Sequence, residues 1–513
     1  MRIGSGVRFG IYLMSLTAGI GGHTRYGSVT LLDEQRLLGV CGQERITRVR
    51  GAGCNPTGLP DEALDELLVR HGRTRLDVSR FVQAGPAGER SPGSGTQVVD
   101  RHQAQAATAF LTSPYDRAAI VVCDHSAPRT SVWVGHGATV RQLDIRWDSV
   151  GFTDVYAQFA AVLGFTGAAA VLRMEALARL VPRARLGEVD RLIDFSGEGL
   201  SLATNWRDVL GRLRDEQGAD GSLGLAGLAA AVQGRLSEIV LQFLRVVRSA
   251  TGEERLCVGG SLFYQSALNS AIRTSGAFLD VFVPVDPGEP GLSVGAAMLA
   301  SGCAPQQVSP FLGPTYREDE IKATLDNCKL PYAWESDEAI TDAVVGALSR
   351  GELVGWFDGA MEWGPRALGA RCILGSPSSP YVLENMNHFL KQREPWRGYA
   401  FSGLESSVSE LFEGPTRAPF MECEFTPREP GRFRHALPAA SAAVRVHTVD
   451  ETTPRRFRWL LESLGRSTGL PYVVNTSFNG FHEPIACSPR DAVRVFYGSS
   501  LDLLVCGPFL LRK

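Results

Sequence analysis

Side chains suited to binding anions are concentrated in the last third of the 513-residue chain. The segment FDGAMEWGPRALGARCIL (357–374) places arginines in a glycine-containing loop after a predicted strand, and KQREPWR (391–397) holds three cations in seven residues. Glycine lets backbone N–H groups approach an anion closely, and arginine adds charge-assisted, bidentate hydrogen bonds. The candidate ligands are Arg366, Lys391, Arg397, Arg445, Asn475 and Ser477. We expect them to form one electropositive site, large enough for several phosphates.

Lysine is rare in this chain and therefore informative. Only four lysines occur in the whole sequence, against a large number of arginines, so arginine is the default cation. We interpret a lysine inside a motif as one kept for its chemistry. Lys391 is accordingly a candidate catalytic residue as well as a phosphate ligand.

A second candidate phosphate contact lies nearer the middle of the chain. The predicted strand Arg255–Val258 runs directly into Gly259 and Gly260. A glycine pair after a strand allows backbone N–H groups to approach a phosphate. This pattern is weak evidence by itself, because a glycine pair is also an ordinary turn.

The composition limits the class of partner. A net charge of -3 creates no field that would gather nucleic acid or an anionic membrane. No run of the sequence approaches the ~20 apolar residues of a membrane span. The start of the chain has basic residues before a short apolar stretch, but it contains Ser and Gly and lacks a cleavage pattern. Together with ten scattered cysteines, this predicts a cytoplasmic protein with reduced thiols and a small-molecule partner.

These candidate residues need a scaffold of strands and helices to position them. Strands that alternate with helices predict an α/β fold, and 513 residues exceed one ordinary core. The predicted strand pairs, long helix and later strands are 26–48, 118–135, 224–250, 351–357 and 469–478. We expect domains at 1–305 and 321–513, joined by a linker at 306–320 that contains two prolines.

In these motifs the chain resembles the O-carbamoyltransferases that act on nodulation factors, cephem antibiotics and tobramycin. The resemblance covers essentially the whole chain and is most specific at 357–397 and 471–491. It implies a Kae1-like N-terminal domain, of the actin/Hsp70/sugar kinase architecture, and a YrdC-like α/β C-terminal domain. The C-terminal domain would bind ATP, with Mg²⁺, and carbamoyl phosphate, and would make a carbamoyl-adenylate. The N-terminal domain would pass the carbamoyl group to a hydroxyl of the acceptor.

The N-terminal half carries family segments but departs from the family's metal motif. The resemblance includes QERITRVR (43–50) and the stretch 258–297, and implies that Gly259, Gly260, Glu289 and Arg101 bind the carbamoyl-adenylate. The family usually has HHxAHA, whose first and last histidines bind a metal, whereas this chain has RHQAQA. The corresponding residues are Arg101 and Gln105 in place of the histidines, with Asp124 and Glu289 at the acidic ligand positions.

This change predicts a site without an iron-type metal. A protonated arginine cannot ligate a metal, and glutamine is a poor ligand for transition metals. We expect Arg101 to supply part of the positive charge that a metal would give, with Asp124 orienting it.

The acceptor-side base also departs from the family. The family's HDxS segment reads Arg25-Tyr26-Gly27-Ser28 here, so its histidine and aspartate are missing. Two other histidines are candidates, His23 just before that segment and His125 directly after Asp124. A neutral imidazole can accept a proton near neutral pH. Because the changes cluster on the acceptor side, we expect an acceptor unlike a polycationic aminoglycoside, such as a glycosylated macrolide of secondary metabolism.

Two other functions remain open from the sequence. One is a non-catalytic binding or regulatory protein of the same fold, which the eroded N-terminal motifs favour. The other is a tRNA-modifying enzyme that makes a threonylcarbamoyl-adenylate, since both domain types occur in that pathway. The intact C-terminal motifs favour the carbamoyltransferase, while the oligomeric state is left open.

Overall fold

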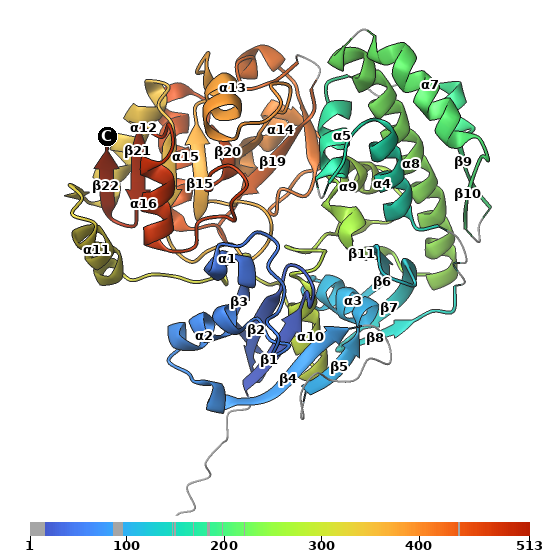
Figure 1. Ribbon diagram of the computed structural model, residues 1–513, viewed down its shortest axis with the longest axis horizontal. Coiled ribbons are helices and arrows are strands. Elements are labelled where there is room, and N and C mark those ends of the chain that lie inside the picture. Colours follow the sequence, from blue (N-terminus) through green and yellow to red (C-terminus); the bar gives the residue numbers. More distant parts are fainter. Residues whose placement is uncertain are drawn as a thin grey trace, which may run out of the picture.

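A computed structural model describes residues 16–513 with several short gaps. The undescribed residues are 1–15, 86–95, 146, 148–149, 168, 182–184, 197–198, 220 and 440–441. Most of the apolar stretch at the start of the chain therefore lies outside the described residues. Figure 1 shows a lower lobe built around β1–β5, a helical lobe that includes α4, α5, α7 and α8, and a C-terminal lobe built around one large sheet.

The first sheet is built from the first hundred residues. Strand β1 (Leu16–Gly21) pairs antiparallel with β2 (Ser28–Asp33), and β2 pairs antiparallel with β3 (Arg36–Gly42). On its other side β1 pairs in parallel with β4 (Val78–Gly85), which is followed by parallel β5 (Thr96–Asp100). The strand order is β3-β2-β1-β4-β5. The predicted strand pair at 26–48 is thus confirmed.

The second sheet repeats this arrangement. Strand β6 (Arg117–Cys123) begins an antiparallel meander with β7 (Thr130–His136) and β8 (Thr139–Gln142). Strands β11 (Arg255–Gly259) and β12 (Asp280–Phe282) then add in parallel on the other side of β6. The order β12-β11-β6-β7-β8 is that of the first sheet read from the other edge. This duplicated α/β unit is the actin/Hsp70/sugar kinase architecture that the sequence predicts.

Two helices pack between the duplicated sheets. Helix α10 (Leu292–Ala300) contacts β1, β2 and β4, and helix α3 (Arg101–Leu111) contacts β6 and β11. The two helices cross closely, because a Cβ at Gly295 would lie 1.9 Å from the carbonyl oxygen of Ala104. A glycine is therefore required at this crossing, and it fixes the N-terminus of α3 relative to both sheets.

The helical lobe covers the far side of the second sheet. Its main helices are α4 (Phe152–Val162), α5 (Ala170–Ala178), α7 (Trp206–Gly218) and α8 (Ser222–Thr251). The span Gly224–Thr251 of α8 is long and apolar enough for a membrane helix, but 61% of its most apolar 18-residue stretch is buried. Its apolar residues belong to the core shared with α4, α5 and α7. The helix predicted at 224–250 is therefore a core helix.

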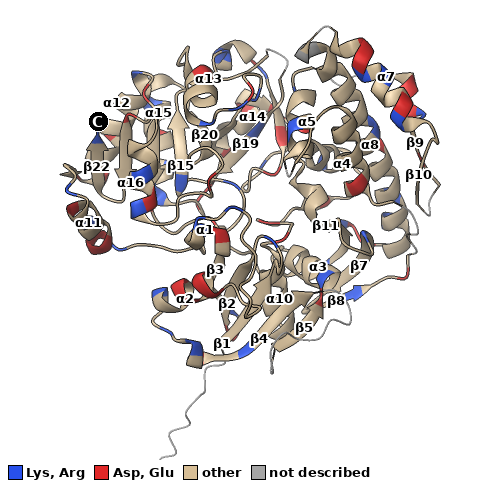
Figure 2. Ribbon diagram, viewed as in Figure 1, with Lys and Arg blue, Asp and Glu red and all other residues tan. Residues whose placement is uncertain are grey.

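The smaller elements of this half connect the main ones. They are α1 (Gln43–Thr47), α2 (Asp61–Arg70), η1 (Arg75–Asp77), α6 (Gly187–Asp190), β9 (Ile193–Phe195), β10 (Leu200–Leu202), η2 (Ser261–Tyr264) and α9 (Ser266–Thr274). Charges of both signs alternate along surface helices such as α7 (Figure 2), where Arg212 pairs with Glu188 and Glu216. Such local pairing leaves these helices with little net charge.

The C-terminal half forms one mixed sheet of ten strands, ordered β13-β22-β21-β14-β15-β20-β16-β19-β18-β17. The strands are β13 (Ala333–Trp334), β14 (Val354–Phe357), β15 (Arg371–Gly375), β16 (Ala400–Leu404), β17 (Phe412–Glu413), β18 (Glu424–Pro427), β19 (Val444–Val449), β20 (Tyr472–Ser477), β21 (Leu503–Cys506) and β22 (Phe509–Arg512). The strands predicted in 351–357 and 469–478 correspond to β14 and β20. This sheet matches the α/β class expected for the second half.

Helices cover both faces of this sheet. They are α11 (Glu318–Asn327), α12 (Asp337–Ser349), α13 (Val382–Glu384), the π-helix η3 (Asn385–Leu390), η4 (Glu405–Ser407), α14 (Val408–Leu411), η5 (Pro430–Phe433), α15 (Arg455–Thr468) and α16 (Pro489–Tyr497). Alternate strand residues enter different cores, since Cys372 and Leu374 join one cluster and Ile373 the other. None of the ten cysteines forms a disulfide in this structure.

Candidate functional site

The loop between β14 and β15 is folded around one buried carboxylate. Glu362 is 1% exposed, and its Oε1 accepts hydrogen bonds from the N–H groups of Leu368 (2.7 Å), Ala370 (2.8 Å) and Arg371 (3.2 Å). Arg371 is fully buried, and its guanidinium donates to backbone carbonyls of the same loop, at Asp358 among others. Both residues therefore build the loop, and Glu362 was missed by sequence reasoning although it lies four residues before Arg366.

Arg366 leaves this loop and reaches the N-terminal half. Its Nη2 donates to the carbonyl oxygen of Tyr264, 3.1 Å away in η2. Burial lowers the pKa of Arg366, and Glu175 acts in the opposite direction. Arg366 is thus placed at the contact between the two halves, with its charge poorly hydrated.

Arg366 belongs to a group of arginines drawn from both halves. Burial, together with Arg366 and Arg179, lowers the pKa of Arg445 on β19 well below its ordinary value. Burial and the neighbouring Arg393 lower the pKa of Arg397 to about 10. A cavity of about 20 Å³ lies here, lined by Arg179 from the N-terminal half and Arg445 from the C-terminal half, among others. We call Arg179, Arg366, Arg397 and Arg445 the four-arginine cluster.

Two buried carboxylates lie beside this cluster. Arg179 forms ion pairs with Glu175 (2.8 Å), one turn away on α5, and with Glu424 on β18. The hydroxyl of Ser266 donates to Glu175 Oε1 at 3.1 Å and to Glu424 Oε1 at 3.0 Å. Burial would raise the pKa of Glu175, but Arg179 and Arg445 outweigh it and lower that pKa. The sequence analysis did not single out Glu175, Arg179 or Glu424.

Lys391 is enclosed by the loop that follows β20. Its Nζ donates to the carbonyl oxygens of Ser477 (2.8 Å) and Asn479 (2.9 Å) and to Asn479 Oδ1 (2.9 Å). Burial, with Arg393 nearby, lowers the pKa of Lys391 well below its ordinary value. Three acceptors nevertheless require all three N–H bonds of the ammonium form. In this structure Lys391 holds the 477–479 backbone, and its role as a phosphate ligand stays a prediction.

Asn475 and Ser477 are likewise engaged with the protein. Asn475 Nδ2 donates to the carbonyl oxygen of Ala367 (2.9 Å) and to Ser402 Oγ (2.8 Å), and its buried Oδ1 has no partner among the described residues. Ser477 Oγ donates to Asn479 Oδ1 at 2.5 Å. The contact with Ala367 places Asn475 beside the loop that carries Arg366, whereas Ser477 contacts Asn479 and Lys391, and a single site formed by all these residues stays a prediction.

The acceptor-side residues form a second cluster at the N-terminus of α3. Arg101 donates from Nε and Nη2 to Asp124 Oδ2, at 3.1 and 2.7 Å, and from Nη1 to Glu289 Oε2 at 2.9 Å. Gln105 Nε2 and Ser261 Oγ donate to the two oxygens of Asp124, at 2.8 and 2.7 Å. Burial would raise the pKa of Asp124, but Arg101 and these hydrogen bonds lower it to about 2. The sequence analysis missed Ser261, although it follows the glycine pair directly.

The residues at this cluster do not fit an iron-type metal. The guanidinium of Arg101 lies between the carboxylates of Asp124 and Glu289 and forms hydrogen bonds with both. Gln105 presents its amide N–H₂ to Asp124, and its buried Oε1, which has no partner among the described residues, is a poor ligand for a transition metal. Among the described residues, no group of three histidine, cysteine, aspartate or glutamate side chains is placed to hold a metal.

The glycine pair lies against the second sheet. Gly260 has φ of 95°, and a Cβ there would lie 2.0 Å from the carbonyl oxygen of Cys123. Its N–H donates to the carbonyl oxygen of Pro287 at 2.6 Å. Gly259 lies against the backbone of α3, because a Cβ there would be 3.0 Å from the carbonyl oxygen of Gln105. Close packing requires glycine at position 260 and leaves little space for a side chain at position 259, and the contact of both glycines with an adenylate stays a prediction.

The two candidate bases lie in different surroundings. His23 is exposed and its Nδ1 faces Gln83 Nε2 at 3.2 Å. His125 follows Asp124, its side chain is 58% exposed, and its Nδ1 lies 3.6 Å from Asp154 Oδ1. Asp154 also accepts a hydrogen bond from Arg129. His125 is therefore next to the Arg101 cluster in sequence and has a carboxylate neighbour that sequence reasoning missed.

Comparisons with known proteins agree with the two-part layout. The family models described as Carbamoyltransferase N-terminus and Carbamoyltransferase C-terminus match residues 94–298 and 345–513. The chain is 30% identical over 470 residues to the uncharacterized protein sll1178 of Synechocystis sp.. This match covers 81% of this chain and 76% of that protein. The chain is 34% identical over 297 residues to the nodulation protein NolO of Bradyrhizobium diazoefficiens, covering 56% of this chain and 54% of NolO.

A solved structure of full-length HypF in its phosphate- and nucleotide-bound form is also similar. The match has 12% sequence identity and a TM-score of 0.40, and it covers 56% of this chain and 46% of HypF. A score at this level does not define a fold, which the strand order of the two sheets defines directly.

Proposed function

The chain belongs to the carbamoyltransferase family, and we propose that it is an ATP-dependent O-carbamoyltransferase that works through a carbamoyl-adenylate. Water first hydrolyses carbamoyl phosphate to carbamate and inorganic phosphate. The carbamate oxygen then attacks the α-phosphorus of ATP, so that a carbamate O–P bond forms and pyrophosphate leaves. An acceptor hydroxyl then attacks the carbamoyl carbon, loses its proton and releases AMP. We propose a natural-product acceptor, such as a glycosylated macrolide, and a cytoplasmic enzyme with domains at 1–305 and 321–513.

The four-arginine cluster is the observation that carries this proposal. Two of its members, Arg445 and Arg397, have lowered pKa values because the group is buried and positively charged. Such a group is stabilised when an anion binds, and preorganised cations in a water-poor site strengthen as charge develops on a leaving pyrophosphate. Mg²⁺ that arrives with ATP would add positive charge on the phosphates themselves.

The segment from the glycine pair to α9 supports transfer between the two halves. Ser261, at one end, donates to Asp124 in the Arg101 cluster. Ser266, at the other end, contacts Glu175 and Glu424 beside the four-arginine cluster. Five residues cover at most ~18 Å, so the two clusters lie within a short path of each other. A carbamoyl-adenylate would travel little between formation and use.

Arg101 provides the charge on the acceptor side in this proposal. Asp124 and Glu289 hold its guanidinium at the position that a family metal would occupy. His125 is the proposed acceptor-side base, because it directly follows Asp124 in the chain and its Nδ1 lies 3.6 Å from Asp154 Oδ1, which can orient the ring. His23 is the alternative base.

A direct test uses the purified full-length chain with ATP, Mg²⁺ and carbamoyl phosphate. We expect release of pyrophosphate that depends on carbamoyl phosphate, and AMP release that rises when a hydroxyl acceptor is added. A second reaction replaces carbamoyl phosphate by threonine and bicarbonate, and pyrophosphate release only there would favour the tRNA-modifying function. Nucleotide binding without turnover in either reaction, across a panel of acceptors, would favour a non-catalytic protein.

A further inference from the structure

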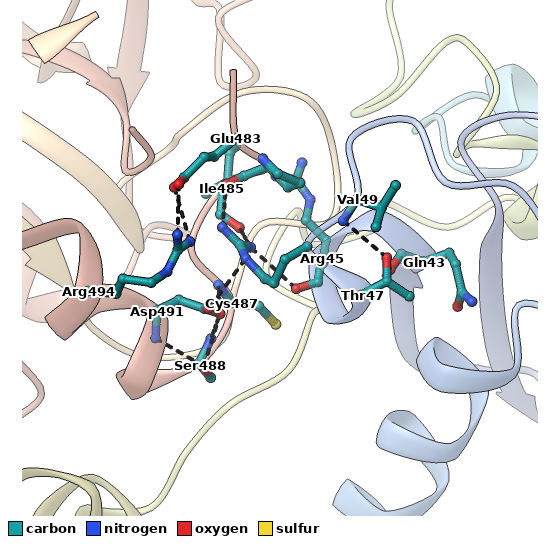
Figure 3. Close-up of polar contacts among 12 residues, drawn as sticks. Gln43, Arg45, Thr47, Val49, Glu483, Ile485, Cys487, Ser488, Asp491 and Arg494 are labelled. Carbon is teal, nitrogen blue, oxygen red and sulfur yellow. Dashed lines mark hydrogen bonds and ion pairs between the residues drawn. The ribbon is translucent and has the colours of Figure 1, made fainter. Parts of the chain in front are cut away.

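Arg48 reaches across from the N-terminal half into the loop after β20. Its Nη1 donates to the carbonyl oxygen of Ile485 at 2.6 Å, and its Nη2 to that of Pro484 at 2.7 Å. Its Nε lies 3.3 Å from Asp491 Oδ1, at the start of α16. Figure 3 shows this part of the C-terminal half, around Ile485 and Asp491, facing helix α1. One side chain thus contacts two backbone carbonyls and one carboxylate of the opposite half.

The backbone at Arg48 is held in a conformation that non-glycine residues rarely adopt. Its φ is 61°, and its N–H donates to the carbonyl oxygen of Glu44 at 3.0 Å, which closes α1. Glu44 Oε2 in turn accepts from the N–H of Gly51 at 2.8 Å. A left-handed arginine costs free energy and persists only where its surroundings determine it. The guanidinium is therefore aimed by a fixed backbone.

The loop that Arg48 holds is also held from its inner side. Lys391 donates to the backbone and side chain of Asn479. Asn479 Nδ2 donates to the carbonyl oxygen of Glu483 at 2.8 Å. The N–H of Ala486 donates to the carbonyl oxygen of Phe478 at 2.7 Å. The loop 477–486 is thus fixed by Lys391 at one end and by Arg48 near the other.

Helix α1 connects the same contact to the acceptor side. The N–H of Gln43 donates to the carbonyl oxygen of Gly27 at 2.7 Å, in the segment Arg25–Ser28 that replaces the family's HDxS. Gln43 Nε2 also donates to Asn55 Oδ1 at 2.8 Å. A helix of five residues spans only ~7.5 Å, so a shift at Gly27 is transmitted to Arg48 over a short, hydrogen-bonded distance.

We propose that Arg48 is a positioning residue that couples the donor-side loop 477–486 to the N-terminal half. Arg48 fixes the outer side of the loop. Lys391 and Asn479 then hold the end of β20, with Asn475 and Ser477, in a fixed position relative to the four-arginine cluster. The inference rests on the proposed function and goes beyond it. Its consequence is that adenylate formation in the C-terminal half depends on a correctly docked N-terminal half, so the reactive intermediate forms where it can be received.

The test compares Arg48→Ala and Arg48→Lys with Arg50→Ala in the full-length chain. Arg50 is the matched control, because it contacts only the neighbouring exposed His482, at 3.1 Å, among the contacts described. Pyrophosphate release without acceptor gives kcat and KM for carbamoyl phosphate, and amide hydrogen exchange follows residues 477–486. Guanidinium chloride at low, non-denaturing concentration tests chemical rescue of Arg48→Ala.

We expect Arg48→Ala to lower kcat/KM by about 10- to 100-fold, which corresponds to the loss of about one charge-assisted hydrogen bond. In Arg48→Ala, amide hydrogen exchange should be faster in residues 477–486 and unchanged in β14. Added guanidinium should restore part of the rate of pyrophosphate release. The kcat/KM of Arg50→Ala should stay within about twofold of wild type. Arg48→Lys should recover little, because one ammonium cannot span two carbonyls and a carboxylate.

Two results would overturn the inference. One is wild-type kcat/KM and exchange in Arg48→Ala, and the other is faster exchange throughout the C-terminal half, which marks a general loss of stability. If the wild-type chain releases no pyrophosphate, the proposed function fails. The exchange comparison then decides the positioning role alone, with local change supporting it and no local change refuting it.

Discussion

Replacing Arg101 by glutamine should destabilise the N-terminal half by an amount that the pKa of Asp124 defines. The Asp124 side chain is 4% exposed, and its pKa is lowered from 3.8 to about 2. A shift of that size corresponds to about 2 kcal/mol at 1.36 kcal/mol per unit. In Arg101→Gln, burial of Asp124 is opposed only by the weaker neutral hydrogen bonds, so its pKa should rise. We therefore expect a loss of at least about 2 kcal/mol at pH 7.

The pH dependence has a definite sign. Because the folded-state pKa of Asp124 is depressed, its stabilising contribution is fully present above the unfolded value of about 3.8 and is lost as pH falls through about 2. In the variant the raised pKa removes this contribution at neutral pH. The difference between wild type and Arg101→Gln should therefore be largest at neutral pH and should shrink as pH falls below about 4.

Native-state hydrogen exchange in α3 and β6 measures the opening free energy of this region without assuming that both domains unfold together. The matched control is Arg117→Gln, which breaks an ion pair with Glu253 (2.8 Å) whose arginine side chain is 63% exposed. An exposed pair of this kind contributes at most about 1 kcal/mol. If Arg101→Gln cost no more than Arg117→Gln at pH 7, the structural role assigned to the Arg101 cluster would be wrong.

Three further predictions follow from the two clusters. The double variant R101H/Q105H should bind about one divalent transition metal per chain through its imidazoles, Asp124 and Glu289, whereas the wild type should not; elemental analysis after dialysis checks this, and equal metal content would contradict it. Lys391→Met should lower pyrophosphate release by ~10²–10³-fold, and a rate within tenfold of wild type would exclude a direct role at the reacting phosphates. His125→Asn should leave pyrophosphate release without acceptor unchanged and lower carbamoyl transfer by ~10²-fold or more, whereas an effect confined to His23→Asn would identify the other base.

Individual strands and helices of the fold were predictable from local signals, whereas the duplicated architecture of the N-terminal half was implied only by the resemblance to the carbamoyltransferase family. The strand pair in residues 26–48 and the helix at 224–250 have the alternation and length that their environments demand. The motifs also predict that Asn475 lies near the loop that carries Arg366, and in the structure Asn475, within β20, donates to the carbonyl oxygen of Ala367 in that loop.

The contacts between the halves were not predictable from single motifs. Glu175 and Glu424 are 249 positions apart and share the hydroxyl of Ser266 only because two folded units are docked. Arg48 lies in the family segment 43–50, but nothing in that segment identifies its carbonyl partners, which are more than 430 positions away in the sequence. Lys391 was predicted to bind a substrate phosphate, yet its direct partners are oxygen atoms of the protein. A buried ammonium group needs hydrogen-bond acceptors, and here the folded chain supplies them.

The charge balance of the Arg101 cluster indicates where the phosphate of an adenylate would be held. One arginine between two carboxylates leaves a formal charge of -1, whereas a divalent metal in the same place would leave zero. Four of the five N–H bonds of Arg101 are used by Asp124 and Glu289, so one remains for a substrate. The four-arginine cluster instead keeps a positive balance, because four guanidiniums against the paired carboxylates of Glu175, Glu424 and Glu394 leave a formal charge of +1. In the proposed reaction the phosphate should therefore be held mainly by the C-terminal arginines. Because a single oxygen atom joins the carbamoyl carbon to the phosphorus, the docked halves must bring the acceptor hydroxyl to that carbon, which makes their docking part of the transfer step.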